Sequence, residues 1–115
     1  MHRSPSVATV LLIEHHALVR QMLARYLRDE CGLNVIGEYA DAAAGLAGIR
    51  SHQPQMVLLE WALPGLIPQR WLETVLRRRH APRIIVVTGV EEPAAAGTAA
   101  SLGVSAFVLK RSGPE

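Results

Sequence analysis

Five short apolar runs recur along the chain. They are ATVLLI (8–13), NVIGEY (34–39), MVLL (56–59), RIIVV (83–87) and AFVL (106–109). The first, third and fourth are almost continuous in Val, Ile, Leu and Met, which is typical of strands buried on both faces of a parallel sheet. The run 34–39 is more polar, so we expect it to lie at an edge of that sheet.

Segments with helical spacing lie between these runs. In the segment 17–30, apolar residues recur at intervals of three and four, which predicts an amphipathic helix. Its expected buried face comprises Val19, Met22, Leu23, Tyr26 and Leu27. Asp41 is a suitable N-cap for a second helix over 42–52. A further helix is predicted over 69–79, with Pro68 as a candidate first residue. Another is predicted over 93–102, with weaker propensity because glycine dilutes it.

The alternation of strands and helices predicts one α/β domain over 1–115, with residues 1–6 as an N-terminal tail. We expect an open parallel five-stranded sheet with helices on both faces and right-handed crossovers. The final residues, RSGPE (111–115), have the composition of a helix start. The chain is therefore interpreted as a fragment that stops where a fifth helix begins, or as a domain whose last layer comes from another chain.

Composition narrows the function classes. Cys31 is the only cysteine, which excludes an internal disulfide framework and a CxxC motif. No apolar run approaches the roughly 18 residues of a membrane span, and the N-terminus lacks a signal-peptide layout, so we expect a cytoplasmic protein without membrane contact. The basic run 77–80 is typical of cations near a helix C-terminus, with contact to nucleic acid or an acidic partner as the alternative.

Polar side chains follow four of the five runs. Glu14, His15 and His16 come after the first run, Glu60 after the third, Thr88 within VVTG after the fourth, and Lys110 after the fifth. In open α/β sheets, ligands and chemistry gather at the carboxyl ends of the strands. We therefore expect these side chains to form one site.

The order of these segments resembles the receiver domains of response regulators, most closely those of NarL/FixJ transcription factors. The resemblance extends from residue 7 to residue 115. It is carried by HALVR (16–20), VIGE (35–38), VLLE with LPG (57–60 and 63–65), VVTG (86–89) and FVLK (107–110). It implies a flavodoxin-like (βα)₅ fold, here without its last helix, and a role in bacterial two-component signalling. It also implies dimerisation through the side formed by the fourth helix and fifth strand, and a DNA-binding domain downstream of this chain.

The same resemblance assigns roles to the polar residues. In receivers, an Asp after the third strand accepts a phosphoryl group from a histidine kinase, and two acids after the first strand help to hold Mg²⁺. Glu60 stands at the acceptor position, and Glu14 and His15 stand at the positions of the two acids. Thr88, Phe107 and Lys110 match the switch threonine, the switch aromatic residue and the active-site lysine.

Two of these substitutions weaken phosphoryl transfer. The imidazole of His15 is a poorer Mg²⁺ ligand than a carboxylate. The carboxylate of Glu60 lies about 1.5 Å further from its backbone than that of Asp, and a misplacement of about 1 Å can cost about a hundredfold in rate. We therefore predict a receiver that acts without phosphorylation and is not an enzyme, with no catalytic residue, weak or absent Mg²⁺ binding and no metal site.

Several interpretations of the site stay open at this point. In the first, Glu60 reaches Lys110 and Thr88 and partly mimics a phosphorylated Asp, with one negative charge in place of about two. In the second, Glu14, His15, His16 and Glu60 form a metal or pH sensor. In the third, the domain is still phosphorylated by an unusual route. A different enzyme on a similar fold is disfavoured, because EHHA (14–17) has no glycine to bind a phosphate.

Overall fold

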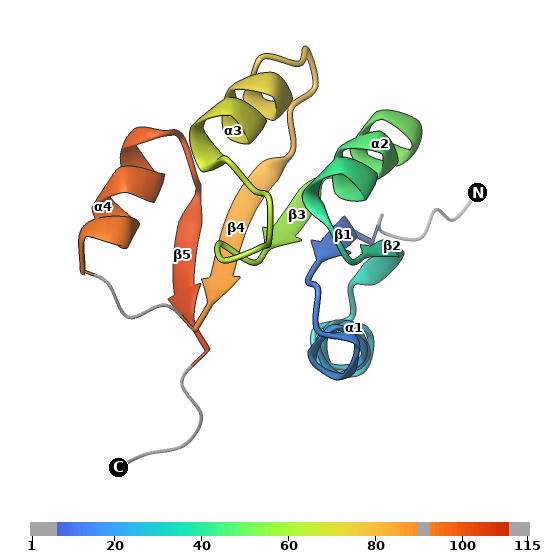
Figure 1. Cartoon of the computed structure of the whole chain (residues 1–115). Helices are drawn as coiled ribbons and strands as arrows, with labels where there is room; N and C mark the ends of the chain where they lie inside the picture. Colours follow the sequence, from blue (N-terminus) through green and yellow to red (C-terminus); the bar gives the residue numbers. More distant parts are fainter. Residues whose placement is uncertain (1–6, 90–92, 111–115) are drawn as a thin grey trace.

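A parallel sheet of five strands in the order β2-β1-β3-β4-β5 forms the centre of the structure (Figure 1). The strands are β1 (Thr9–Ile13), β2 (Asn34–Tyr39), β3 (Met56–Leu59), β4 (Arg83–Thr88) and β5 (Ala106–Leu109). The helices are α1 (Ala17–Asp29), α2 (Ala42–His52), α3 (Pro68–Leu76) and α4 (Pro93–Ser101). The computed structural model describes residues 7–89 and 93–110. The predicted N-terminal tail, 1–6, and the predicted helix start, 111–115, lie outside the described residues.

The predicted fold class is confirmed, since the sheet is parallel throughout and has the strand order of flavodoxin-like folds. The polar run 34–39 forms β2 at one edge, as its composition predicted. The other edge is β5, and β1 lies between β2 and β3. No helix among the described residues is long and apolar enough to cross a membrane.

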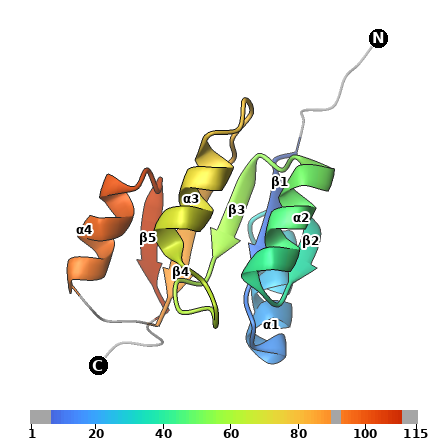
Figure 2. The ribbon, with the colours of Figure 1, turned by 45° about the horizontal axis from the view of Figure 1, so that its top comes forward.

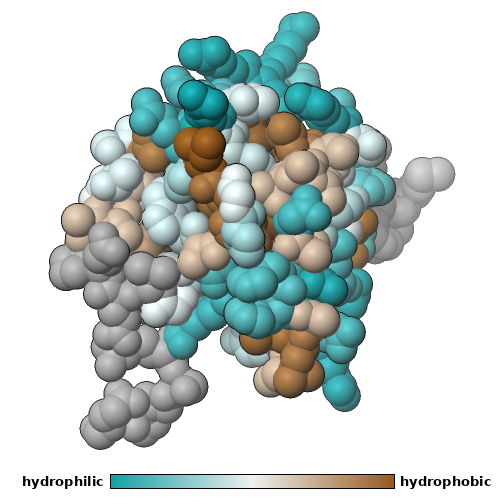
Figure 3. Space-filling view, viewed as in Figure 1, coloured by the Kyte–Doolittle hydropathy of each residue, from teal (hydrophilic) through white to brown (hydrophobic). Residues whose placement is uncertain are grey.

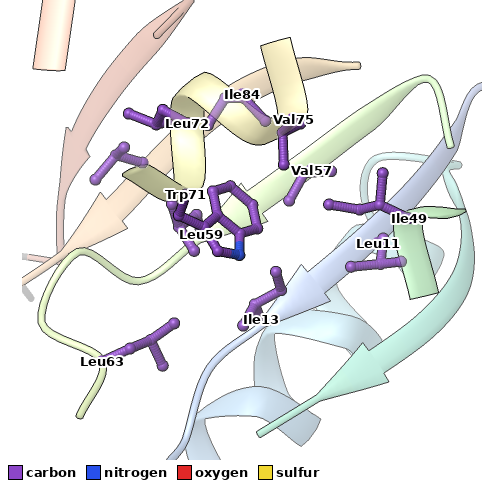
Figure 4. Close-up of a cluster of buried hydrophobic side chains, with 11 residues drawn as sticks. Leu11, Ile13, Ile49, Val57, Leu59, Leu63, Trp71, Leu72, Val75 and Ile84 are labelled. Atoms are coloured by element: carbon purple, nitrogen blue, oxygen red, sulfur yellow. The ribbon is translucent and has the colours of Figure 1, made fainter. Parts of the chain in front are cut away.

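Alternate side chains of the sheet supply two separate cores. On one face, Leu11, Val57 and Val86 belong to a cluster with the buried residues of α2 and α3 (Figure 4). On the opposite face, Val10, Leu12 and Leu58 belong to a cluster with Ala24 and Leu27 of α1. Figure 2 shows the resulting layers, with α2 and α3 in front of the strands and α1 behind them. Burial on both faces explains why β1 and β3 are almost continuous in aliphatic residues.

The buried face predicted for α1 was partly wrong. Met22 and Tyr26 are 64% and 57% exposed, whereas Ala24 and Leu27 are buried. A single helix that lies on a flat sheet buries only a narrow stripe, so apolar residues on its flank stay in water. In Figure 3, hydrophobic surface is visible at the bottom of the view, beside and over α1.

The predicted starts of two helices are confirmed. The carboxylate of Asp41 accepts a hydrogen bond from the backbone N–H of Ala44 at 2.8 Å, which caps α2. Pro68 occupies the first turn of α3, where its missing N–H is not needed. The end of α3 was predicted too late, because the helix stops at Leu76 and Arg77 is its C-cap. Most of the basic run 77–80 therefore follows the helix.

Close packing of α2 on the sheet depends on Gly45. A Cβ atom at this position would lie 2.3 Å from Cδ1 and 2.7 Å from Cγ1 of Ile13, which is completely buried. Ile13 is the last residue of β1 and directly precedes Glu14. The glycine thus allows α2 to approach the strand that carries the site.

Replacing Gly45 by Ala should destabilise the domain by about 1–3 kcal/mol, because overpacking outweighs the gain in helix propensity. The matched control is Gly97→Ala in α4, where an added Cβ meets no atom within 4 Å. That variant should stabilise the domain by about 0.5–1 kcal/mol. Urea unfolding followed by circular dichroism measures both changes, and equal effects at the two positions would contradict the packing argument.

Candidate functional site

Backbone hydrogen bonds past the strand ends fix the positions of the site residues. The N–H of Glu60 donates to the carbonyl oxygen of Ile13 at 3.0 Å, which sets Glu60 beside Glu14. The N–H of Lys110 donates to the carbonyl oxygen of Thr88 at 2.7 Å. The sheet pairing therefore extends beyond the last strand residues and brings side chains from β1, β3, β4 and β5 to one edge.

The ammonium group of Lys110 joins two carboxylates. Its Nζ donates to Oε1 of Glu60 at 2.5 Å and also to Oε1 of Glu14. Glu14 is 1% exposed and Glu60 is 6% exposed, so both acids lie in the protein interior. Two buried anions are stable side by side only when a cation and hydrogen bonds compensate their charge.

The second oxygen of each carboxylate binds a backbone amide. Oε2 of Glu60 accepts from the N–H of Ala62 at 2.9 Å, and Oε2 of Glu14 accepts from the N–H of His16 at 3.0 Å. All four oxygens therefore have a hydrogen-bond donor. The carboxylates are held in fixed orientations instead of pointing into solvent.

These contacts favour the charged forms of Glu60 and Lys110. Burial by itself raises the pKa of Glu60, but hydrogen bonds from Lys110, Thr88 and the Ala62 amide lower it by more. The net pKa of Glu60 lies below its ordinary value of 4.5. Burial lowers the pKa of Lys110, but hydrogen bonds to Glu14 and Glu60 raise it above its ordinary value of 10.5. Glu60 and Lys110 are thus both charged at neutral pH.

Two imidazoles border the outer side of Glu14. Nδ1 of His16 lies 3.3 Å from Oε2 of Glu14, and Nδ1 of His15 lies 3.7 Å from the same oxygen. These three residues form a group whose ligand atoms lie within 4.8 Å of one another. The metal set expected from the sequence comprised Glu14, His15, His16 and Glu60. The structure groups the first three of these, and Glu60 does not belong to the group.

Phe107 of β5 contacts Trp61, which directly follows Glu60 in the chain. Their ring centroids are 6.3 Å apart with an interplanar angle of 71°, which is an edge-to-face arrangement. Trp61 also lines a groove of about 470 Å³ between the start of α3 and α4, together with Ile67 and Ala94. Trp61 therefore packs against β5 and contributes to an apolar surface next to the site.

The structure thus brings together Glu14, Glu60, Thr88 and Lys110, as the sequence predicted. Three features were not predicted: the backbone donors to the two carboxylates, the contact of Lys110 with Glu14, and the contact between Trp61 and Phe107. Backbone donors leave no sequence signal, because every residue except proline carries the same N–H.

Comparisons with known proteins agree on one family. Residues 10–115 match the family described as response regulator receiver domain. A probable transcriptional regulatory protein, NarL of Mycobacterium tuberculosis, is 31% identical over 94% of this chain. A protein-glutamate methylesterase/protein-glutamine glutaminase of Xanthomonas oryzae is 32% identical over 88% of this chain. The chain spans 50% of the length of the first relative and 28% of the second.

Solved structures give the same result. The signal receiver domain of NarL from Mycobacterium tuberculosis has a TM-score of 0.86 at 30% identity, covering 95% of this chain and 88% of that one. A two-component response regulator of the LuxR family from Aurantimonas has a TM-score of 0.84 at 29% identity, covering 93% and 76%.

Replacing Lys110 by Met should lower the free energy of unfolding by about 3–5 kcal/mol at neutral pH, because two buried carboxylates lose their cation. The pH dependence should change too. The lowered pKa of Glu60 stabilises the fold above pH 4.5, the ordinary pKa of this group. This contribution is lost as the pH falls through the pKa of Glu60 in the folded state. The raised pKa of Lys110 stabilises the fold below pH 10.5, the ordinary pKa of this group. This contribution is lost as the pH rises through the pKa of Lys110 in the folded state.

Urea unfolding at a series of pH values measures this prediction. The Lys110→Met variant should lack the alkaline loss, and its deficit against wild type should shrink in acid. Glu73→Gln is the control, because it breaks an exposed pair in which Arg77 lies 3.7 Å from Glu73. That change should cost at most about 0.5 kcal/mol. Similar losses in the two variants would show that the buried cluster is not a major source of stability.

Proposed function

Because the chain belongs to the response regulator receiver domain family, with a match over residues 10–115, we propose that it regulates its partner through protein contacts without being phosphorylated. The observation that carries this proposal is the double anchoring of Glu60. One oxygen binds Lys110 at 2.5 Å and the other binds the Ala62 amide at 2.9 Å. An acceptor carboxylate needs an oxygen oriented to attack phosphorus in line, and the two donors fix the Glu60 carboxylate in an orientation set by Lys110 and the Ala62 amide instead.

The residue at the second acidic position supports the same proposal. His15 offers nitrogen where Mg²⁺ prefers oxygen ligands in near-octahedral geometry. Glu14, the remaining acid, is shared with Lys110. We therefore propose that Mg²⁺ binds weakly or not at all at this edge of the sheet.

Glu60 also interacts with Lys110 and Thr88, the two residues that the resemblance expects to contact a phosphoryl group. Its carboxylate binds Lys110, and a hydrogen bond with Thr88 contributes to its lowered pKa. We propose that Glu60 partly replaces a phosphorylated Asp and holds the site in one arrangement. The replacement is partial, since a carboxylate carries one negative charge and a phosphoryl group about two.

The proposed output is transcription regulation in a bacterial two-component pathway. It follows from the likeness to NarL, a probable transcriptional regulatory protein of which this chain spans 50%. We propose a DNA-binding domain outside this chain and no enzymatic activity in the receiver itself. The match to the methylesterases does not argue otherwise, because it spans only 28% of their length.

The proposed contact surface is the α4–β5 side, here defined as α4 with Val108 and Leu109 of β5. Both residues are exposed, although they are large and apolar. In the described residues β5 pairs with β4 and forms an edge of the sheet. Exposed apolar side chains on an edge strand favour association, and we propose a second copy of the chain as the occupant.

The wild-type domain should not be phosphorylated by acetyl phosphate with Mg²⁺, and beryllofluoride with Mg²⁺ should leave its amide NMR spectrum unchanged. The double variant His15→Asp with Glu60→Asp should regain both responses, because it restores an oxygen ligand and a shorter acceptor. Intact-mass spectrometry measures the phosphorylated fraction. The single variant Glu60→Asp is the control and should respond weakly, since His15 still impairs Mg²⁺ binding. Stoichiometric phosphorylation of the wild type would exclude the proposal.

Self-association through the α4–β5 side should appear as a rise in mass-average molecular weight with concentration, measured by sedimentation velocity. Replacing Val108 and Leu109 by Lys should abolish that rise, because buried ammonium groups oppose the contact. Leu18→Lys on α1 is a matched control, since Leu18 is also exposed but lies away from this side. A monomeric wild type, or equal effects of both changes, would rule out this surface as a dimer contact.

A further inference from the structure

Three ligand atoms converge where β1 passes into α1. Oε2 of Glu14 lies 3.3 Å from Nδ1 of His16 and 3.7 Å from Nδ1 of His15. The three residues each offer one ligand atom within 4.8 Å of the other two. Nδ1 of His15 is buried and has no hydrogen-bond partner. Buried polar atoms without a partner are rare in folded proteins, so this nitrogen requires an explanation.

We propose that Glu14, His15 and His16 bind one divalent transition-metal ion of the Zn²⁺ class. In a tetrahedral site with metal–ligand bonds of about 2.0–2.1 Å, neighbouring ligand atoms lie about 3.3–3.4 Å apart. The two distances from Oε2 of Glu14, 3.3 and 3.7 Å, are close to this edge length. A metal on Nδ1 of His15 would also occupy the lone pair that has no partner in the protein.

The donor set selects against Mg²⁺. Two imidazole nitrogens and one carboxylate oxygen suit Zn²⁺, Ni²⁺ or Cu²⁺, whereas Mg²⁺ requires oxygen ligands in near-octahedral geometry. Three protein ligands leave a fourth position for water, as in open zinc sites. The exposed ring of His16 leaves a path from solvent to this position.

The metal and Lys110 use different oxygens of Glu14. Lys110 binds Oε1, whereas Oε2 accepts from the His16 amide, faces the two imidazoles and keeps a lone pair for a metal. A cation on Oε2 weakens the attraction of Glu14 for Lys110 and leaves Glu60 as the main partner of the ammonium. Metal binding would thereby change the ion pair between Glu14 and Lys110, on which the arrangement of the receiver site depends.

Two positive groups near the site limit its affinity for a metal cation. The guanidinium of Arg20 donates to the carbonyl oxygen of Glu14 at 2.8 Å, and the N-terminus of α1 carries a partial positive charge. We therefore expect dissociation constants in the micromolar range. This inference does not rest on the loss of phosphorylation, because the metal site can exist in a receiver that is or is not phosphorylated.

Isothermal titration of the full chain with ZnCl₂, without any phosphate donor, tests the proposal. One Zn²⁺ per chain should bind, and MgCl₂ should give no saturable heat. His15→Ala and His16→Ala should each reduce the affinity by more than about tenfold, since even the loss of an outer-shell partner costs about 10–100-fold. His52→Ala and His80→Ala are matched controls, because these exposed histidines lie outside the group and should leave the affinity unchanged.

A second measurement separates a built site from scattered binding. Co²⁺ should give the visible absorption of a four-coordinate complex in the wild type, and this band should be lost in His15→Ala while the far-ultraviolet circular dichroism is retained. His15→Asp should shift the preference from Zn²⁺ towards Mg²⁺. No saturable Zn²⁺ binding, or equal binding by the His15→Ala variant and the His52→Ala control, would overturn the proposal.

Discussion

The ammonium group of Lys110 is the interaction on which the site depends. It binds carboxylates that come from two other strands, at positions 50 and 96 residues earlier in the chain. Without this cation, Glu14 and Glu60 would be two buried like charges, and the protein would have to protonate or expose one of them. The ion cluster therefore joins β1, β3 and β5 and also sets the charge of the carboxyl edge of the sheet.

Charge balance explains how the two carboxylates of this cluster are accommodated. A third carboxylate at position 15 would add a negative charge that the single ammonium of Lys110 does not compensate. With His15 at that position, two carboxylates remain. A single ammonium and two backbone amides then satisfy all four oxygens. His15, which adds no carboxylate, is thus compatible with the anchoring of Glu60 by a single ammonium.

The two proposals for this edge concern different sides of Glu14. The inner oxygen belongs to the cluster that holds Glu60 and Lys110, whereas the outer oxygen faces His15 and His16. Under these proposals a bound cation acts as an input, because it would change how strongly Glu14 attracts Lys110. The apolar α4–β5 side is the proposed output surface.

Most of the fold could be predicted from local patterns. Aliphatic runs identified the strands, and Asp41 and Pro68 identified the starts of two helices, because capping and proline geometry act within a few residues. The buried face of α1 was less predictable. Periodicity shows which residues are apolar, but the width of the buried stripe depends on what packs against the helix, and Met22 and Tyr26 lie outside it.

The sequence by itself determined that Glu14, Glu60, Thr88 and Lys110 meet at one edge, since parallel strands direct their carboxyl ends the same way. The tertiary structure decided which of them bind one another. Lys110 donates to both carboxylates, and backbone amides donate to their other oxygens. Glu14, His15 and His16 form one group of possible metal ligands, to which Glu60 does not belong. These contacts depend on the order of the strands and on donor–acceptor distances that must be correct to a few tenths of an ångström. A pattern of residue types along the chain does not contain this information.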